Sequence, residues 1–347
     1  MFRSIISLPF ALAVLAVTGP LQAAPGPTDE LAKIDKYLPD ETVAVFVLNM
    51  KPIRESKVYA KGIEKVVNEL LKTNELQWLL KEVGLKRDQV QSILNDAGLD
   101  PLNDIDRVIL AKRPGREGMS APFLVAEGRF DPDKILAAAD TLSKNSGTQY
   151  KARKPYEIGK AKVFEVVYSL GFLGEGTAFV ATILNKNTLI FAATTEEIEQ
   201  AVEKAAGKKE TEFKVEGLAK LIDKMDSKKA LTVACAGEKS LIDDGIESVT
   251  ASFTVTDVIN AKVVVTAKDA EAAKKINAQY AEGLAELTRQ FGTRKDPKPV
   301  LDVLKGIKQS RKELAITLEA QCGIDAVEAV VRALLGIAPP PLPPAAK

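Results

Sequence analysis

The spacing of apolar residues changes repeatedly between the two-residue period of strands and the three-to-four-residue period of helices. Residues 42–48 form a Val-rich run that predicts a strand, and from Glu55 the apolar positions Tyr59, Ile63 and Val66 follow a helical period. We expect further strands at residues 106–112, 122–130, 149–154, 162–168, 178–184, 188–193, 231–236 and 313–322. Both kinds of element are therefore expected along the whole chain.

Capping residues mark where the expected helices begin and end. Helical stretches over 75–83 and 88–97 stop before Gly84 and Gly98, as helices with a left-handed C-terminal residue do. Thr194 and Glu197 have the spacing of a capping box, which predicts a helix that ends at Gly207. Helices are also expected from Asp131 to Ser143, after Asp269, and from Asp325 to Leu335.

Hairpins followed by helices indicate an α+β fold of mainly antiparallel sheet with helices packed on one face. The second half repeats part of this order, because residues 246–249 resemble residues 105–108 and Asp269 opens a helix as Asp131 does. The offsets are 141 and 138 residues. We therefore expect two similar lobes, residues 24–210 and 211–337, that arose by internal duplication. The alternative is a coincidence of the kind any α+β protein can contain.

The first 23 residues have the three-part plan of a secretory signal peptide. Arg3 supplies the positive end, residues 5–17 form an apolar run too short to span a bilayer, and Ala23 offers the small residue before cleavage. We expect cleavage after Ala23 and export to the periplasm or the cell exterior. The alternative is an uncleaved membrane anchor. Past this leader, charge interrupts every apolar stretch, so the mature chain is not expected to span a membrane.

The charge balance argues against nucleic acid as a partner. The chain has 48 Lys and Arg against 47 Asp and Glu, and removal of Arg3 with the leader brings the mature protein to a formal net charge of zero. Proteins that bind phosphate backbones normally carry a basic excess.

The Pro-rich tail at residues 338–347 is expected to be disordered.

The chain contains no histidine, which removes the Ser-His-Asp and Cys-His catalytic arrangements and the commonest metal ligand. Cys235 and Cys322 could pair in an oxidising compartment, and the alternative is two buried thiols that pack as small apolar groups. We assign no catalytic, cofactor-binding or metal-ligating residue, and no cofactor is expected.

Three further features have structural explanations that we prefer to functional ones. The loop at residues 171–176 is Gly-rich, but a strand follows it where a phosphate loop needs a helix. The oxygen-rich cluster of Asp100, Asn103, Asp104 and Asp106 does not have the spacing of an EF-hand, and turns and caps explain it. Trp78 lies in a helical pattern and is expected in the core.

Several turn and cap segments together resemble a family of exported proteins of unknown function that is abundant in planctomycete bacteria. The segments are residues 37–42, 98–108, 128–132 and 265–270. The resemblance covers most of the mature chain. It implies export and a similar fold, and it implies no catalytic residue.

The sequence alone assigns no molecular function. The leading hypothesis is a non-enzymatic binding or structural protein of the envelope, whose partner is another protein or an apolar small molecule. One alternative is a carrier of a lipid-like ligand. Another is a hydrolase that needs no histidine and uses paired carboxylates or a Ser-Lys pair.

Overall fold

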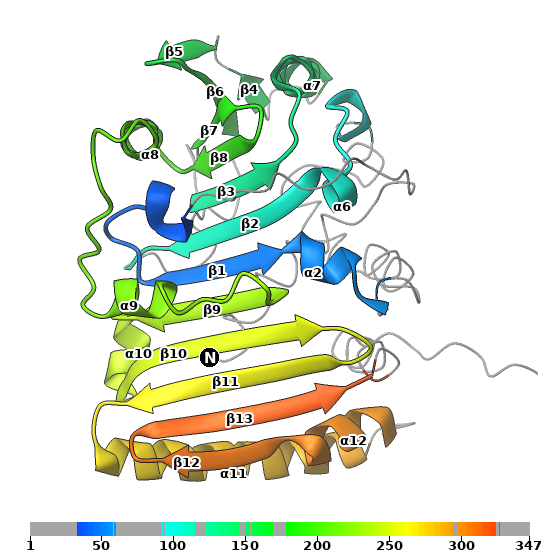
Figure 1. Cartoon of the computed structure of the whole chain (residues 1–347), viewed down its shortest axis with the longest axis vertical. Helices are drawn as coiled ribbons and strands as arrows, with labels where there is room; N and C mark the ends of the chain where they lie inside the picture. The colour runs from blue at the N-terminus through cyan, green and yellow to red at the C-terminus, as the bar shows by residue number, and fades with distance from the viewer. Residues whose placement is uncertain are drawn as a thin grey trace, which may run out of the picture.

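One large antiparallel sheet organises the protein. The computed structural model describes residues 33–57, 59, 92, 94–114, 123–145, 150–152, 155–168, 178–293, 298–323 and 326. Within these residues the fold is mixed α+β, and the strands lie side by side in the order β12-β13-β11-β10-β9-β1-β2-β3-β8-β7-β6-β4, with β5 also paired to β6. Figure 1 shows the sheet extending along the molecule.

The first half of the sheet comes from the N-terminal part of the chain. Its strands are β1 (Ala44–Asn49), β2 (Ile105–Lys112), β3 (Phe123–Gly128), β4 (Tyr150–Ala152), β5 (Tyr156–Ile158), β6 (Ala161–Tyr168), β7 (Ala178–Asn185) and β8 (Thr188–Ala192). The helices described in this part are η1 (Ile34–Tyr37), α2 (Met50–Arg54), α6 (Pro101–Asp104), α7 (Pro132–Asn145) and α8 (Thr195–Ala205).

The second half of the sheet follows a connector at residues 206–217. Its strands are β9 (Leu231–Ala236), β10 (Ile246–Val255), β11 (Ile259–Ala267), β12 (Lys308–Lys312) and β13 (Ala315–Cys322). The helices described here are α9 (Leu218–Ile222), α10 (Lys239–Asp243), α11 (Ala270–Gly292) and α12 (Lys298–Gly306). No described helix is long and apolar enough to span a membrane.

The predicted caps at Thr194 and Asp269 are confirmed. The Thr194 side chain and the Glu197 side chain bond each other's backbone N–H groups at the start of α8, which is the expected capping box. Asp269 accepts the Ala272 N–H at the start of α11, at 2.8 Å. The signal peptide, the helix at 75–83 and the Pro-rich tail lie outside the described residues, and so does the helix at 325–335 except for residue 326.

Helices pack on both faces of the first half, so the prediction of helices on one face is wrong. On one face, η1, α8 and α9 cover a core that contains Val45, Ile109 and Val125. On the other face, α7 packs against a core that contains Leu124 and Ala126. Both faces need cover because β3 and β8 are apolar at consecutive positions instead of alternating with polar residues.

Pairing between β1 and β9 joins the two halves. Phe46 lies opposite Val233, and Ala44 lies opposite Cys235. The Asn49 N–H donates to the Ala230 carbonyl at 2.8 Å just beyond one end of this ladder. The core also crosses the join, because α9 of the second half packs with η1 of the first. The described strands of both halves form one continuous sheet. The division into two lobes near residue 210 stays a prediction from the sequence.

Gly128 allows a close backbone contact at the end of β3. The Arg129 N–H donates to the Asp104 carbonyl at 2.8 Å, and a Cβ atom on Gly128 would lie 2.0 Å from that same carbonyl oxygen. Any side chain larger than hydrogen would therefore separate α6 from the end of β3.

We predict that Gly128→Ala lowers the free energy of unfolding by about 2 kcal/mol or more, because the backbone must shift to admit the methyl group. Urea denaturation measures the change. The matched control is Gly283→Ala in α11, where nothing lies within 4 Å of the added Cβ. That control should raise stability by about 0.5–1 kcal/mol through helix propensity. A Gly128→Ala protein as stable as the native one would contradict the close contact.

Candidate functional site

Beyond β9, no described helix covers one face of the second half. The cross-strand neighbours Val45, Ala234, Thr250, Val264 and Thr317 share one face of the sheet. This is the face that η1, α8 and α9 cover in the first half. In the second half, α10 and α11 pack on the opposite face, and Figure 1 shows β10, β11 and β13 unobstructed.

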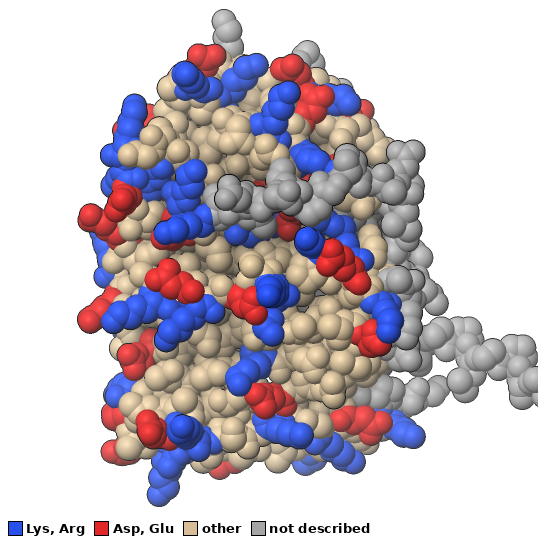
Figure 2. Space-filling model, viewed as in Figure 1, with Lys and Arg blue, Asp and Glu red and all other residues tan. Residues whose placement is uncertain are grey.

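We call this partly exposed surface the open face. It consists of Ser248, Thr250, Ser252, Thr254, Asn260, Lys262, Val264, Thr266, Ala315, Thr317, Glu319 and Gln321. Most of these side chains are hydroxyls or amides, which both donate and accept hydrogen bonds. Lys262 and Glu319 form an ion pair at 2.9 Å, and each side chain is about half exposed. Figure 2 shows a largely uncharged surface here, broken by a few charged residues.

Strand β12 forms the edge of the sheet beside the open face. Among the described strands it pairs with β13 alone, and four of its five side chains are exposed. Within the same part of the chain, no further backbone group bonds to β12 on its outer side. The side chains of Lys308, Ser310 and Lys312 point to the open face, because their cross-strand partners do. Arg311 lies on the opposite face. We call β12, with the side chains of Lys308, Ser310, Arg311 and Lys312, the basic edge.

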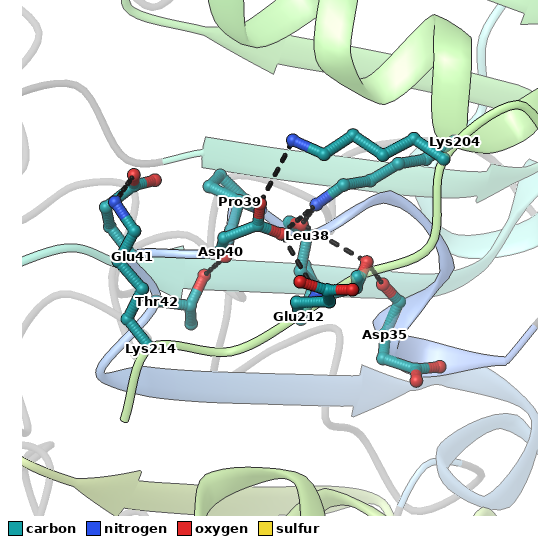
Figure 3. Close-up of polar contacts among 11 residues, drawn as sticks. Asp35, Leu38, Pro39, Asp40, Glu41, Thr42, Lys204, Glu212 and Lys214 are labelled. Atoms are coloured by element: carbon teal, nitrogen blue, oxygen red, sulfur yellow. Dashed lines mark hydrogen bonds and ion pairs between the residues drawn. The ribbon is translucent and has the colours of Figure 1, made fainter. Parts of the chain in front are cut away.

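A polar cluster holds the covering elements on the first half, as Figure 3 shows. Lys204 of α8 is 1% exposed and donates to an Asp40 carboxylate oxygen at 2.6 Å. Lys209 lies 3.1 Å from the second oxygen of that carboxylate, and the Glu212 N–H donates to the carboxylate as well. The Thr211 hydroxyl donates to the carbonyl of Asp35, a residue of η1, at 2.7 Å.

This Asp40 cluster ties three segments together: the turn before β1, the end of α8 and the connector. Burial raises the pKa of the Asp40 carboxyl, but the hydrogen bonds from Lys204, Lys209 and Glu212 lower it by more. The net pKa lies below the ordinary value of 3.8, so Asp40 is ionised at neutral pH. The contacts of Asp40 hold the connector, which leads to α9. Among the described helices, α9 is the last one that covers this face of the sheet.

A second buried polar group lies on the covered face. Arg107 and Glu127 are cross-strand neighbours that form an ion pair, and their side chains are 4% and 5% exposed. Thr188 and Asn49 extend this row on either side and are also buried. Burial raises the pKa of Glu127, and the charge of Arg107 offsets this only in part. The sheet and the elements that cover this face shield both side chains from solvent.

The structure keeps Cys235 and Cys322 apart as free thiols. They lie on β9 and β13, with β10 and β11 between them. A disulfide needs Cα atoms about 4.4–6.8 Å apart, which two intervening strands do not allow. Burial raises the pKa of Cys235 to about 12 and raises that of Cys322. Both sulfurs are therefore protonated at neutral pH and are poor nucleophiles.

The oxygen-rich cluster near α6 is occupied by internal hydrogen bonds. Asp104 accepts the Asp100 N–H at 2.7 Å, and Asp100 accepts the Asn103 side-chain amide at 2.7 Å. Asp106 forms an ion pair with Arg54 at 2.6 Å. In the part of the chain that the structure describes, no group of three or more His, Cys, Asp or Glu is placed to hold a metal ion. Trp78 and the loop at 171–176 lie outside that part.

Sequence reasoning missed the basic edge and both buried ion pairs. Residues 308–312 lack the apolar alternation that identifies a strand, because neither face of β12 is deeply buried. Arg107 and Glu127 gave a usable signal: each is a charged residue at a position whose neighbours two residues away, Ile109 and Val125, are fully buried. Comparisons with protein-family models, curated proteins and solved structures found no match.

We predict that Lys204→Met lowers the free energy of unfolding by about 3 kcal/mol at neutral pH, because it leaves a carboxylate in a largely buried site without its closest cation. The Asp40 pKa is lowered in the folded state, so its contribution is complete above pH 3.8 and disappears as the pH falls through the lower folded value. The difference from the native protein should therefore shrink in acid.

Urea denaturation between pH 2 and pH 7 measures this. The control is Lys214→Met, which removes an exposed ion pair with Glu41 and should change stability little. A deficit for Lys204→Met that is the same at every pH would show that the Asp40 charge does not matter.

Proposed function

We propose that this chain is an exported, non-enzymatic envelope protein that binds another protein at the basic edge of its sheet. Residues 1–23 act as the cleaved leader in this proposal, and the mature protein works in the periplasm or outside the cell. An exposed edge strand binds an extended segment of a partner through backbone hydrogen bonds.

The observation that carries this proposal is the outer side of β12, with which no other described strand pairs. The opposite edge of the described sheet is formed by β4 and β5, which are only three residues long. β12 has five residues and lies beside β13, which pairs with β11 on its other side. Natural edges are usually shortened or covered to prevent pairing with other chains. A longer exposed edge beside an open polar face is therefore the best candidate for a binding surface.

The hydroxyl-rich open face supports a polar protein partner over an apolar ligand. Thr250, Ser252 and Thr317 offer hydrogen bonds across a broad surface next to β12. An apolar small molecule would gain little there, because the hydrophobic effect requires apolar area on both sides. The proposal therefore places the binding protein ahead of the carrier.

We also propose that the two halves of the sheet derive from a duplicated unit. The pairings Phe46–Leu110–Leu124–Phe191 have counterparts in Val233–Ala251–Val263–Leu318. The ladder of each hairpin is irregular near its start, after Ile105 in one and after Ile246 in the other. These two residues stand 141 positions apart, as do Leu110 and Ala251. In this proposal the repeats meet at the β1–β9 pair.

Loop contacts outside the ladders support the same correspondence. The Arg129 N–H donates to the Asp104 carbonyl, and the Lys268 N–H donates to the Gly245 carbonyl. A helix with an Asp cap then follows in both halves. The open face would then be a specialised feature of the second unit, because the first unit buries the equivalent face.

The proposed function predicts a position-specific contact in the native envelope. A photo-crosslinking amino acid at Ser310 should form an adduct with one reproducible protein, and its attachment point should map to an extended segment of that protein. The same crosslinker at Glu199, which is exposed on α8, serves as the control and should give no such adduct. The absence of an adduct at residue 310, or the same products from both positions, would refute binding at β12.

A further inference from the structure

The cations of the basic edge lack ion-pair partners among the described residues. Lys308, Arg311 and Lys312 are exposed, and no acidic side chain in the described part of the chain lies within ion-pair distance of them. The nearest acidic candidate by register is Glu319, which lies opposite Lys308 but pairs with Lys262. A chain with a mature net charge near zero thus presents a local excess of positive charge along one edge strand.

A second copy of this chain is a poor occupant of that edge. If two β12 strands paired antiparallel over all five residues, Lys308 of each copy would lie opposite Lys312 of the other. Both residues project to the same face of the sheet. Like charges directly opposite each other destabilise a strand pair. The lysines therefore act against self-association, a known use of Lys on edge strands.

We infer that the basic edge binds an acidic extended segment of a partner protein, added to the sheet as a further strand. This inference rests on the proposed function, since it names the chemistry of the partner at the same strand. Charge complementarity selects the occupant: the groups that repel a second β12 attract a strand with carboxylates at the matching positions.

The register of β12 defines where those carboxylates must lie. On an antiparallel partner strand, the residues opposite Lys312 and Lys308 are four positions apart and face the open side. The residue opposite Arg311 is adjacent to the first of these and faces the other side. The expected motif is therefore two consecutive acidic residues followed, after two others, by a third. The partner residue opposite Ser310 lies between the residues opposite the two lysines, and we expect Thr or Ser there.

A synthetic peptide tests this motif with the mature full-length protein. The probe is a nine-residue peptide with Glu at its third, fourth and seventh positions and Thr or Val elsewhere, and the control peptide has Gln at those three positions. Fluorescence anisotropy should show at least about tenfold tighter binding of the Glu peptide at low salt, from three cross-strand charge pairs. The advantage should fall as salt is raised. Amide hydrogen exchange of residues 308–312 should slow on binding.

Charge reversal gives the matched control on the protein side. Lys308→Glu combined with Lys312→Glu changes only exposed side chains, but Lys308 lies opposite Glu319, so circular dichroism first checks that the fold is retained. The folded variant should not bind the Glu peptide. The same variant should gain affinity for a peptide with Lys in place of Glu. Equal binding of the Glu and Gln peptides, or unchanged binding to the reversed variant, would overturn the acidic partner.

The outcome also separates this inference from the proposed function. If crosslinking at Ser310 captures a partner segment that is not acidic, the edge binds a protein and the charge inference fails. If residue 310 yields no adduct and no peptide slows exchange in β12, both fail, and the lysines serve only to keep the edge unpaired.

Discussion

The pairing of β1 with β9 is the interaction on which the rest of this structure depends. Without it each half would end in an exposed strand with apolar residues, because Val45, Val47 and Ala234 are buried at the join. The antiparallel ladder removes both edges at once and makes the two halves one sheet. The edges that remain among the described strands are β12 at one end and the short strands β4 and β5 at the other.

The same join explains why one face changes from apolar to polar across the sheet. The connector after α8 is held by the Asp40 cluster and leads to α9, whose Leu218 and Ile222 complete the core over β1 and β9. Beyond β9 no described helix covers this face, and Thr250 and Thr317 occupy positions in line with Val45. An uncovered face must be polar to avoid a large exposed apolar patch. The open face and the basic edge are thus consequences of where the helical cover ends.

Much of the fold could be predicted from the sequence, because strands with a buried face carry a clear pattern. β9 has the predicted bounds, and the caps at Thr194 and Asp269 bond as expected. Hairpin connectivity does not reveal the cover on both faces, whereas the consecutive apolar residues of β3 and β8 do. β12 was missed because an exposed edge strand needs no apolar residues, so its sequence carries no strand signal. The candidate site lay where pattern reasoning is least informative. Pairings between distant residues, such as Lys204 with Asp40, have no local signature at all.

Residue-resolved amide hydrogen exchange measures the β1–β9 join directly. If the two halves form one sheet, the amides of residues 45–48 and 231–235 exchange as slowly as those of the central parts of β2 and β10, and they lose protection in a single transition as denaturant is added. If β1 and β9 instead exchange as fast as the edge strand β12 while β2 and β10 stay protected, the halves are separate sheets. The open face would then not result from the point at which the helical cover ends.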